Sequence, residues 1–273
     1  MPPAIDLDAY FERIGYAGPR APTLEALQGI HLGHAQTIPF ENVNPLLKWP
    51  VRLDAQSLQQ KLVHDGRGGY CFEQNLLLSY ALQGLGFEVT GLAARVAWDA
   101  PDNAVRPRSH MLLLINLDGT PYIADAGFGG LTLTGPLRLQ ADIEQSTPHE
   151  PFRLIRAADE FLLQAQFGGT WRTLYRFGLQ EQFLADYEVT NWYLSNHPES
   201  RFVTRLIAAR PDADRRYALL DNELAVHHVN GRTERRVLAS ASELQDTLRT
   251  VFRVRLPDSP DLEAALTRLA AHG

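Results

Sequence analysis

The spacing of apolar residues changes near Phe87, and this change constrains the fold more than any other feature of the chain. Over about ninety residues before it, apolar side chains recur at the three- and four-residue spacing of helices, as in Leu7, Tyr10, Phe11 and Ile14. After it, short apolar runs alternate with glycine-containing turns, a pattern typical of antiparallel strands. Helices and strands that are separated along the chain predict an α+β fold.

Two groups of strands are expected after this change. The first group comprises Val89 to Trp98, Ser109 to Leu117, Pro121 to Ala126, Phe152 to Arg156, Phe161 to Phe167 and Thr170 to Phe177. The second group comprises Phe202 to Ala209, Tyr217 to Leu220, Leu224 to Val229 and Thr233 to Leu238. The first group predicts an antiparallel sheet or barrel, and helices that begin after Ser240 and Ser259 follow the second. Ile38 to Val43, before the strands, is expected to be a loop because Pro39 disfavours helix.

The composition limits where the protein acts and what it binds. With 273 residues, of which 45% are hydrophobic, the chain is long enough for two domains, or for one core with a smaller layer. Its formal charge of −6 offers no basic face to a polyanion, so nucleic acid is not an expected partner. The longest apolar run, Met111 to Ile115, is too short to span a membrane, and Met1 to Ala4 do not begin a signal peptide. A soluble, cytoplasmic protein without membrane contact is therefore expected.

The only cysteine, Cys71, lies in the stretch RGGYCFEQN, Arg67 to Asn75. Gly68 and Gly69 allow a sharp turn, and the apolar residues after the cysteine recur at helical spacing. Cys71 is therefore expected in the first turn of a helix, where unpaired N–H groups and the helix dipole favour thiolate over thiol. Two interpretations follow: a catalytic nucleophile, or a buried structural cysteine. A single cysteine also excludes an internal disulfide.

A hairpin after this helix supplies the base and the acid that a thiolate nucleophile needs. Asp118 and Gly119 are expected to form a two-residue turn. Leu112 then lies opposite Asp125, and His110 is the diagonal neighbour of this acid, about 7–8 Å away between α-carbons. Separately, each has a structural interpretation, as a core histidine and a turn former. Buried side by side, they must satisfy each other or a third group, and the end of the cysteine helix is the expected third group.

Six sequence blocks resemble those of a known family, the prokaryotic arylamine N-acetyltransferases. The blocks are IPFEN at Ile38 to Asn42, RGGYCFE at Arg67 to Glu73, SHMLL at Ser109 to Leu113, DAGFGG at Asp125 to Gly130, LYRF at Leu174 to Phe177 and NWYLSNHPESRF at Asn191 to Phe202. They follow the family order over most of the chain. Two departures are Ala126, where valine is common, and Asn196, where threonine often precedes His-Pro. Neither falls on a catalytic position.

The resemblance implies a fold, a triad and a reaction. The expected fold has an N-terminal helical bundle (residues 1–88), a central antiparallel β-barrel (89–199) and a C-terminal α/β lid (200–273), with a cysteine-protease-like Cys-His-Asp core. Cys71, His110 and Asp125 match the catalytic triad. The enzyme would move an acetyl group from acetyl-CoA to arylamines, arylhydrazines or N-hydroxyarylamines by a ping-pong mechanism through an acetyl-Cys71 thioester, a reaction of xenobiotic metabolism.

The family roles of the triad members follow from their chemistry. His110 would hold the thiolate as an ion pair and later accept the proton of the amine, while Asp125 would fix the histidine tautomer. The backbone N–H of Cys71 is the donor expected to stabilise the oxyanion. No metal or prosthetic group is expected, since His227 and His228 are adjacent and point to opposite faces of a strand. The protein is expected to be a monomer or a homodimer.

Further positions match the family around this triad. Phe40, Val96 and Phe128 match positions that line the acceptor pocket, although core packing explains Val96 equally well. Arg106, Ser109, Gly127 and Phe202 are candidates for binding coenzyme A. Glu41 and Arg67 are expected to pair in a structural role, because an unpaired charge beside a buried thiolate is costly.

Two other functions use the same residues. A thiol hydrolase or a transglutaminase-like enzyme has the same Cys, His, Asp order, and the fate of the acyl-enzyme distinguishes it from a transferase. A non-enzymatic binding module is the third possibility. It would be favoured if Cys71 reacted with iodoacetamide no faster than free cysteine below pH 7.

Overall fold

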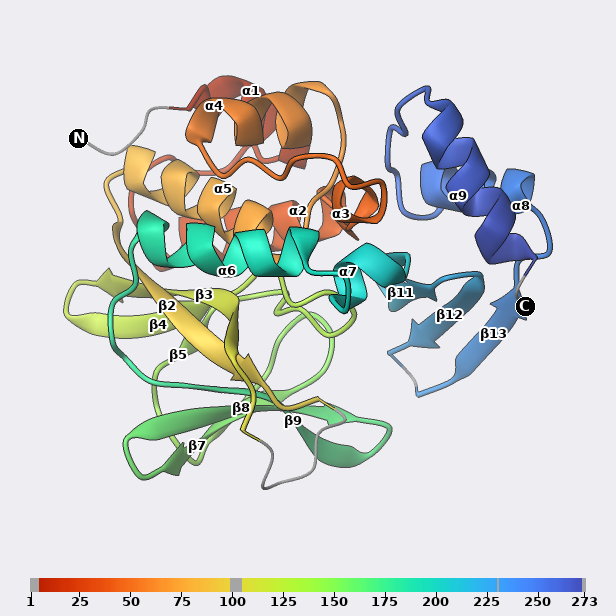
Figure 1. The fold of residues 1–273 in the computed structure, drawn as a ribbon. Coiled ribbons are helices and arrows are strands. Elements are labelled where there is room, and N and C mark those ends of the chain that lie inside the picture. The colour runs from red at the N-terminus through yellow and green to blue at the C-terminus, as the bar shows by residue number, and fades with distance from the viewer. Residues whose placement is uncertain (1–4, 99–104, 230, 272–273) are drawn as a thin grey trace.

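The computed structural model describes residues 5–98, 105–229 and 231–271, so Met1 to Ala4 lie outside the described part. It contains a helical layer, an eight-stranded antiparallel sheet and a smaller C-terminal unit of strands and helices. In Figure 1 the helices of the first part of the chain cover one side of the large sheet, and the C-terminal unit lies beside both. The predicted α+β class is confirmed.

The first part of the chain is helical, as its apolar periodicity predicts, and side chains cap the start of three of its helices. The elements are α1 (Leu7–Ile14), α2 (Leu24–Thr37), α3 (Val43–Leu46), α4 (Ala55–Leu58), the π-helix η1 (Gln59–His64) and α5 (Cys71–Gly84). The side chains of Asp6, Thr23 and Asp54 accept hydrogen bonds from backbone N–H groups of the first turns that follow them. Helix α5 is buried on nearly every side, from Cys71 to Leu82, so it forms the centre of this layer.

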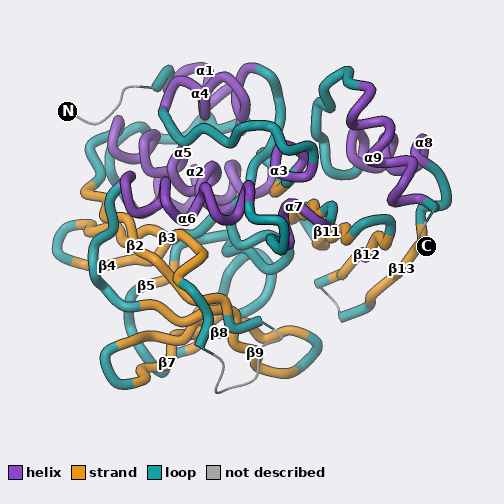
Figure 2. The backbone as a smooth tube through the Cα atoms, in the orientation of Figure 1, coloured by secondary structure: helices purple, strands orange, loops and turns teal. Residues whose placement is uncertain are grey.

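The large sheet has the strand order β5-β4-β3-β2-β9-β8-β7-β6, and all neighbours are antiparallel. Its strands are β2 (Glu88–Val96), β3 (Arg108–Leu117), β4 (Thr120–Ala124), β5 (Leu137–Arg138), β6 (Glu144–Gln145), β7 (Phe152–Ala157), β8 (Glu160–Phe167) and β9 (Thr170–Phe177). Leu92, Leu112, Phe152 and Leu163 from four of these strands share one buried core. The backbone of the sheet curls like a barrel (Figure 2), and these buried side chains form its core.

The β3–β4 hairpin fixes the geometry of the site. Leu117 pairs with Thr120 and Leu113 with Ala124, which confirms the predicted register. The turn residues have positive φ values of 49° at Asp118 and 78° at Gly119, as a type I′ turn requires.

The predicted strand end at Ala126 is wrong, because β4 stops at Ala124. The next backbone donors bind side chains instead of a neighbouring strand. The N–H of Ala126 donates to Asn75 Oδ1 (3.0 Å), and the N–H of Gly127 donates to Asp125 Oδ1 (2.9 Å). Asp125 therefore begins a loop.

The C-terminal unit contains a five-stranded sheet in the order β1-β10-β11-β12-β13. Its elements are β1 (Phe40–Glu41), α7 (Arg201–Thr204), β10 (Ile207–Pro211), β11 (Arg215–Leu220), β12 (Glu223–His228), β13 (Thr233–Val237), α8 (Ala241–Thr250) and α9 (Pro260–Ala270). Helix α6 (Leu184–Asn196) precedes α7 and lies along the helical layer in Figure 1, where its Tyr187 and Leu194 share a buried core with the N-terminal helices. Strand β1 comes from the N-terminal part of the chain and pairs with β10. This sheet therefore joins the two ends of the sequence.

Two sequence-based expectations about these elements are wrong. Ile38 to Val43 is not simply a loop, since Phe40 pairs with Ala209 on one side and bridges Gly69 on the other. The segment from Phe202 to Ala209 begins as helix α7, because Ser200 Oγ accepts the N–H of Phe202 (3.3 Å), and becomes a strand only at Ile207.

Helix α6 was not expected from the sequence. Its buried side includes Asn191 and Ser195, whereas Val189 and Trp192 are exposed. Apolar periodicity is therefore a poor guide to this helix.

The boundaries of the three expected domains, 1–88, 89–199 and 200–273, stay a prediction. Each part of the chain has its own cluster of buried apolar residues, but the clusters also share elements. Met111 of β3 packs with the helices, and Val43 packs with the C-terminal unit. None of the helices in residues 5–98, 105–229 and 231–271 is long and apolar enough to cross a membrane.

Candidate active site

Cys71 is the first residue of α5, as predicted, and only 4% of its surface is exposed. Tyr70 precedes the helix in an extended conformation, with φ −94° and ψ −171°. The N–H of a first helical residue has no partner within the helix and points, with its neighbours, toward the region where the thiol lies. The sulfur lies 3.8 Å from the carbonyl oxygen of Ser109 on β3. The helix end therefore faces the strand that carries the predicted base.

Two glycines permit the close packing around Cys71. A Cβ atom at Gly127 would lie 2.8 Å from the Cα of Cys71, and a Cβ atom at Gly68 would lie 2.1 Å from the carbonyl oxygen of Pro39. Both distances are shorter than a carbon atom tolerates, so a side chain at either position would displace backbone. The loop after Asp125 and the loop before Cys71 can approach their neighbours only because these residues are glycines.

His110 lies on β3 with 3% of its surface exposed, and its Nε2 is 2.7 Å from Asp125 Oδ2. Burial alone would lower its pKa, but the charge and hydrogen bond of Asp125, together with Cys71, raise the pKa of His110 to about 10. Because Asp125 occupies Nε2, Nδ1 is the ring nitrogen left for the sulfur. The contact between His110 and Asp125, expected from the hairpin register, is present.

Asp125 is fully buried and accepts four hydrogen bonds. Oδ1 accepts from Asn75 Nδ2 (2.9 Å) and from the N–H of Gly127 (2.9 Å), and Oδ2 accepts from the hydroxyl of Tyr175 (2.9 Å) in addition to His110. Burial would raise the pKa of this carboxyl, but His110, Asn75 and Gly127 lower it overall. The arrangement stabilises a carboxylate beside the imidazolium.

Sequence reasoning missed three residues of this site. Asn75 donates to Asp125 and to the carbonyl oxygen of Met111 (2.7 Å). Tyr175 of β9 lies with its ring centroid 4.9 Å from that of His110. The hydroxyl of Thr132 donates to the backbone carbonyl of Asp125 (2.9 Å).

Only one of these three residues carried a signal in the sequence. Asn75 is a polar residue one helical turn after Cys71, on the same face of the helix, so it could have been recognised. Nothing local distinguishes Tyr175 or Thr132.

Aromatic rings surround the histidine and the nucleophile loop. The ring of Phe128 lies 5.3 Å from that of His110, edge to face, and the ring of Phe40 lies 6.1 Å from that of Phe202. Gly129 lies between these two groups, and a Cβ atom there would be 3.7 Å from the ring of Phe40. Val96 is half-buried on β2 and pairs with Tyr175. The predicted pocket residues thus lie on elements that meet near His110.

The candidates for binding coenzyme A occupy different surroundings. Ser109 and Gly127 contact Cys71 through the backbone, and the ring of Phe202 lies 5.2 Å from that of Tyr70. Arg106 is exposed, and its carbonyl oxygen accepts a hydrogen bond from Arg95. Their role in binding the coenzyme stays a prediction.

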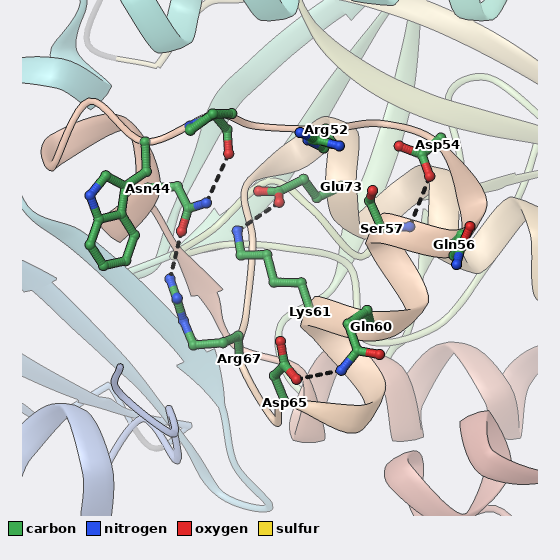
Figure 3. A pocket seen from close by; sticks show the side chains of 12 residues that line it. Asn44, Arg52, Asp54, Gln56, Ser57, Gln60, Lys61, Asp65, Arg67 and Glu73 are labelled. Carbon is green, nitrogen blue, oxygen red and sulfur yellow. Dashed lines mark hydrogen bonds and ion pairs between the residues drawn. The ribbon is translucent and has the colours of Figure 1, made fainter. Parts of the chain in front are cut away.

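A pocket of about 600 Å³ lies beside the loop that precedes Cys71 and is lined by polar residues, among them Lys61, Arg67 and Glu73 (Figure 3). Arg67 donates to Glu41 Oε1 at 2.7 Å through Nη2, so the expected pair is present. Burial opposes ionisation of Glu41, but Arg67 and Lys61 lower its pKa overall. The triad does not line this pocket.

The floor of this pocket supports the start of α5. Lys61 Nζ donates to Glu73 Oε1 (2.6 Å), and the other oxygen of Glu73 accepts the N–H of Tyr70 (3.1 Å). Burial raises the pKa of Glu73, although Lys61 acts against it. Paired charges thus hold the turn on which Cys71 is mounted.

Comparisons with known proteins show which proteins the chain is similar to. The chain matches the N-acetyltransferase family model over residues 23–260. It is 47% identical over 270 residues to the arylamine N-acetyltransferase of Mycobacterium tuberculosis, with 97% of this chain and 95% of that protein covered. It is 42% identical over 204 residues to the arylamine N-acetyltransferase / N-hydroxyarylamine O-acetyltransferase of Salmonella typhimurium, with 75% and 72% covered. The solved structure of Mycobacterium marinum arylamine N-acetyltransferase in complex with CoA superposes with a TM-score of 0.93 at 40% identity, covering 97% of this chain and 99% of that one.

Proposed function

The chain belongs to the arylamine N-acetyltransferase family, and from this premise we propose how it transfers acetyl groups from acetyl-CoA to aromatic amines. It is an enzyme of the acyltransferase class. The observation that supports a thiol-based mechanism best is the buried His110–Asp125 pair, at 2.7 Å, whose histidine has a raised pKa partly because of Cys71. Such a pair supplies the cation that a thiolate nucleophile needs.

In the first half-reaction the Cys71 thiolate attacks the acetyl carbon of acetyl-CoA. The backbone N–H of Cys71, free of a helical partner, donates to the oxyanion that forms. The carbon–sulfur bond to coenzyme A then breaks, and His110 gives its proton to the departing thiolate. This step leaves acetyl-Cys71, free CoA and a neutral imidazole, with Nε2–H still held by Asp125.

In the second half-reaction the amine nitrogen attacks the acetyl-Cys71 carbonyl. Neutral His110 accepts the proton that the nitrogen loses, the carbon–sulfur bond breaks, and the thiolate–imidazolium pair forms again. The carboxylate of Asp125 stabilises the imidazolium in the resting enzyme, because four donors keep it ionised.

The surroundings of His110 suit a flat acceptor. Phe128 and Tyr175 present rings within 5.3 Å of the imidazole or of each other, and aromatic rings stack on such surfaces. We assign Phe40, Val96 and Phe128 to the acceptor pocket and Arg106, Ser109, Gly127 and Phe202 to the binding of coenzyme A. Arylhydrazines and N-hydroxyarylamines are further acceptors in this proposal. We also propose that the enzyme is cytoplasmic and that it is a monomer or a homodimer.

Acetyl-CoA added without amine provides the test. A burst of free CoA, equal in amount to the enzyme, is expected, together with an acetyl adduct on Cys71 that mass spectrometry of a peptide digest locates. Cys71→Ser should give neither, and it should keep the fold because the replacement is isosteric. Rapid turnover of acetyl-CoA without amine would instead favour a thiol hydrolase, and absence of both burst and adduct would exclude the covalent mechanism.

A further inference from the structure

A fully buried cation of the C-terminal sheet contacts the loop that carries the triad aspartate. Arg216 lies on β11 with 1% of its surface exposed. Its Nε donates to Glu150 Oε1 and Oε2, both at 2.9 Å, and its Nη1 donates to the carbonyl oxygen of Thr132 at 3.0 Å. A planar guanidinium can do both at once, because its donors point in fixed and different directions.

Thr132 connects Arg216 to the residues of the candidate active site. Its hydroxyl donates to the carbonyl oxygen of Asp125 (2.9 Å) and accepts the N–H of Phe128 (3.3 Å). The same residue therefore closes the loop between the acid of the triad and the ring beside His110. Arg216 fixes the backbone of Thr132, and Thr132 fixes the backbone at both Asp125 and Phe128.

His149 forms a second connection between the C-terminal unit and the loop after Asp125. His149 Nε2 lies 2.6 Å from the carbonyl oxygen of Asp212, and its Nδ1 lies 3.2 Å from the hydroxyl of Thr134. Burial, followed by the charge of Arg216, lowers the pKa of His149, so the ring is neutral near pH 7. A neutral ring can donate to Asp212 and accept from Thr134. The titratable groups that face Arg216 are Glu150, His149 and His227, the last of which pairs with Arg216 from β12.

We propose that Arg216 is a positioning residue for acetyl transfer, acting through Thr132 on Asp125 and Phe128. The C-terminal sheet is then part of the scaffold of the active site, in addition to any role as a lid. This inference rests on the proposed role of the Cys71, His110 and Asp125 triad. A misplaced Asp125 would hold the imidazolium less well, and a misplaced Phe128 would alter the acceptor pocket.

The test measures acetyl transfer in Arg216→Met, which removes the donors and keeps an unbranched apolar chain of similar length. We expect kcat/KM to fall between about tenfold and a hundredfold, as small displacements of catalytic groups do. The high-pH limb of the kcat/KM profile, where the imidazolium is lost, should move about one pH unit lower. A purely structural residue would lower the melting temperature without moving that limb.

Matched variants separate the route from general damage. Arg215→Met changes the neighbouring arginine of β11, which pairs with exposed Asp214, and should leave kcat/KM within about twofold. Thr132→Val keeps the shape and the backbone carbonyl but removes the hydroxyl, and it should shift the pH limb in the same direction as Arg216→Met. If Arg216→Met does not fold, Arg216→Lys replaces it, since lysine keeps the charge for Glu150 but has no second nitrogen for Thr132.

Two outcomes overturn the inference: a folded Arg216 variant with an unchanged pH profile and kcat/KM, or an unchanged profile in Thr132→Val. Asp125→Asn is measured in parallel so that a failure of the proposed triad can be distinguished from a failure of the proposed role of Arg216. If Asp125→Asn is also fully active, the proposed triad fails. If Asp125→Asn is inactive while the Arg216 variants behave like wild type, only the role of Arg216 fails.

Discussion

Helix α2 and strand β3 both bury histidines, and the two regions treat them in opposite ways. His34 of α2 is fully buried between the hydroxyl of Tyr10 and the side-chain oxygen of Gln74, and burial lowers its pKa to about 3. His110 of β3 is almost as deeply buried, yet its pKa is raised to about 10. The difference is the charge of the partner, since neutral partners cannot compensate for the loss of water around an imidazolium.

His31 lies near Asp125, but this proximity does not raise its pKa above the ordinary value. It is fully buried on α2, and the backbone carbonyls of Asp125 and Leu133 favour its protonated form. Burial nevertheless lowers its pKa to about 4, because those carbonyl dipoles and the more distant charge of Asp125 are too weak. Among the buried histidines His31, His34 and His110, direct contact with a carboxylate therefore distinguishes the proposed catalytic histidine from the other two.

Replacing each histidine by glutamine gives the largest contrast. His110→Gln should lower kcat/KM for an aromatic amine such as aniline at least about 10⁴-fold, because the proton acceptor and the counter-ion of Cys71 are both lost. His34→Gln should stay within about tenfold of wild type, since it alters support rather than the reacting groups. Steady-state kinetics of both purified variants test the contrast. Equal losses in the two variants would contradict the assignment of His110.

Asp125→Asn should make His110 resemble the histidines of α2. With a neutral partner, burial should dominate and the imidazole should lose its proton near neutral pH. We expect kcat/KM to fall about 10³- to 10⁴-fold, as loss of the acid does in other triads. Alkylation of Cys71 by iodoacetamide at pH 6 should also slow, though less than in His110→Gln, because the asparagine still holds part of the ring orientation. An alkylation rate equal to that of wild type would show that Asp125 does not control the ion pair.

The contacts that could be predicted from the sequence are those fixed by residues close together in the chain. The contact between His110 and Asp125 could be predicted because a two-residue turn at Asp118 and Gly119 fixes the register locally. The start of α5 at Cys71 could be predicted for the same reason, from two glycines and an apolar periodicity. These local rules provide the nucleophile helix and the hairpin, which are the two elements that meet at the site.

Long-range contacts were beyond such rules. The pairing of Phe40 with Ala209 joins residues from opposite ends of the chain, and no local pattern specifies it. The hydroxyl of Tyr175 reaches Asp125 from another strand, and Arg216 reaches Thr132 from another sheet. In each case the packing of complete elements determines which residues meet, so the spacing of residues along the chain does not predict the contact.

The pH dependence of stability should distinguish the two kinds of histidine. His34 has a folded pKa of about 3 and an unfolded value near 6.5, so the unfolded chain binds more protons between these values. Its neutral state therefore stabilises the fold fully above pH 6.5, and this contribution is lost as the pH falls, by up to about 1.4 kcal/mol per pH unit. His110 is protonated in both states below pH 6.5, and its contribution is lost only as the pH rises toward 10.

Urea unfolding at pH 7.0, 6.0 and 5.0 measures this difference. His34→Gln should be less stable than wild type at pH 7, and the deficit should shrink by up to about 1.4 kcal/mol for each unit below pH 6. His110→Gln should show a nearly constant difference from wild type between pH 5.0 and 6.0, and the contribution of His110 to wild-type stability should be smaller at pH 7.0, where the unfolded histidine has lost much of its proton. A constant deficit for His34→Gln would mean that this ring is charged in the folded protein.

The smallest expected effect concerns the buried hydrogen bond between Tyr10 and His34. The amide nitrogen of Gln74 donates to the carbonyl oxygens of Pro39 (2.7 Å) and Ile38 (3.1 Å), so its oxygen must face His34 and accept from Nε2–H at 2.7 Å. Nδ1 is then an acceptor, and the hydroxyl of Tyr10 donates to it at 2.8 Å.

Tyr10→Phe removes that donor and leaves a buried nitrogen unpaired, which should cost about 1–2 kcal/mol of unfolding free energy without a measurable change in kcat/KM. Tyr16→Phe is the matched control, because the hydroxyl of Tyr16 donates to the carbonyl oxygen of Pro19 (2.7 Å) at an exposed site where water can replace it. Denaturant unfolding of both variants at pH 7 should give a loss for Tyr10→Phe and a change below about 0.5 kcal/mol for Tyr16→Phe. Equal stabilities of the two variants would mean that the buried hydrogen bond between Tyr10 and His34 contributes no more to the free energy of unfolding than the exposed one of Tyr16.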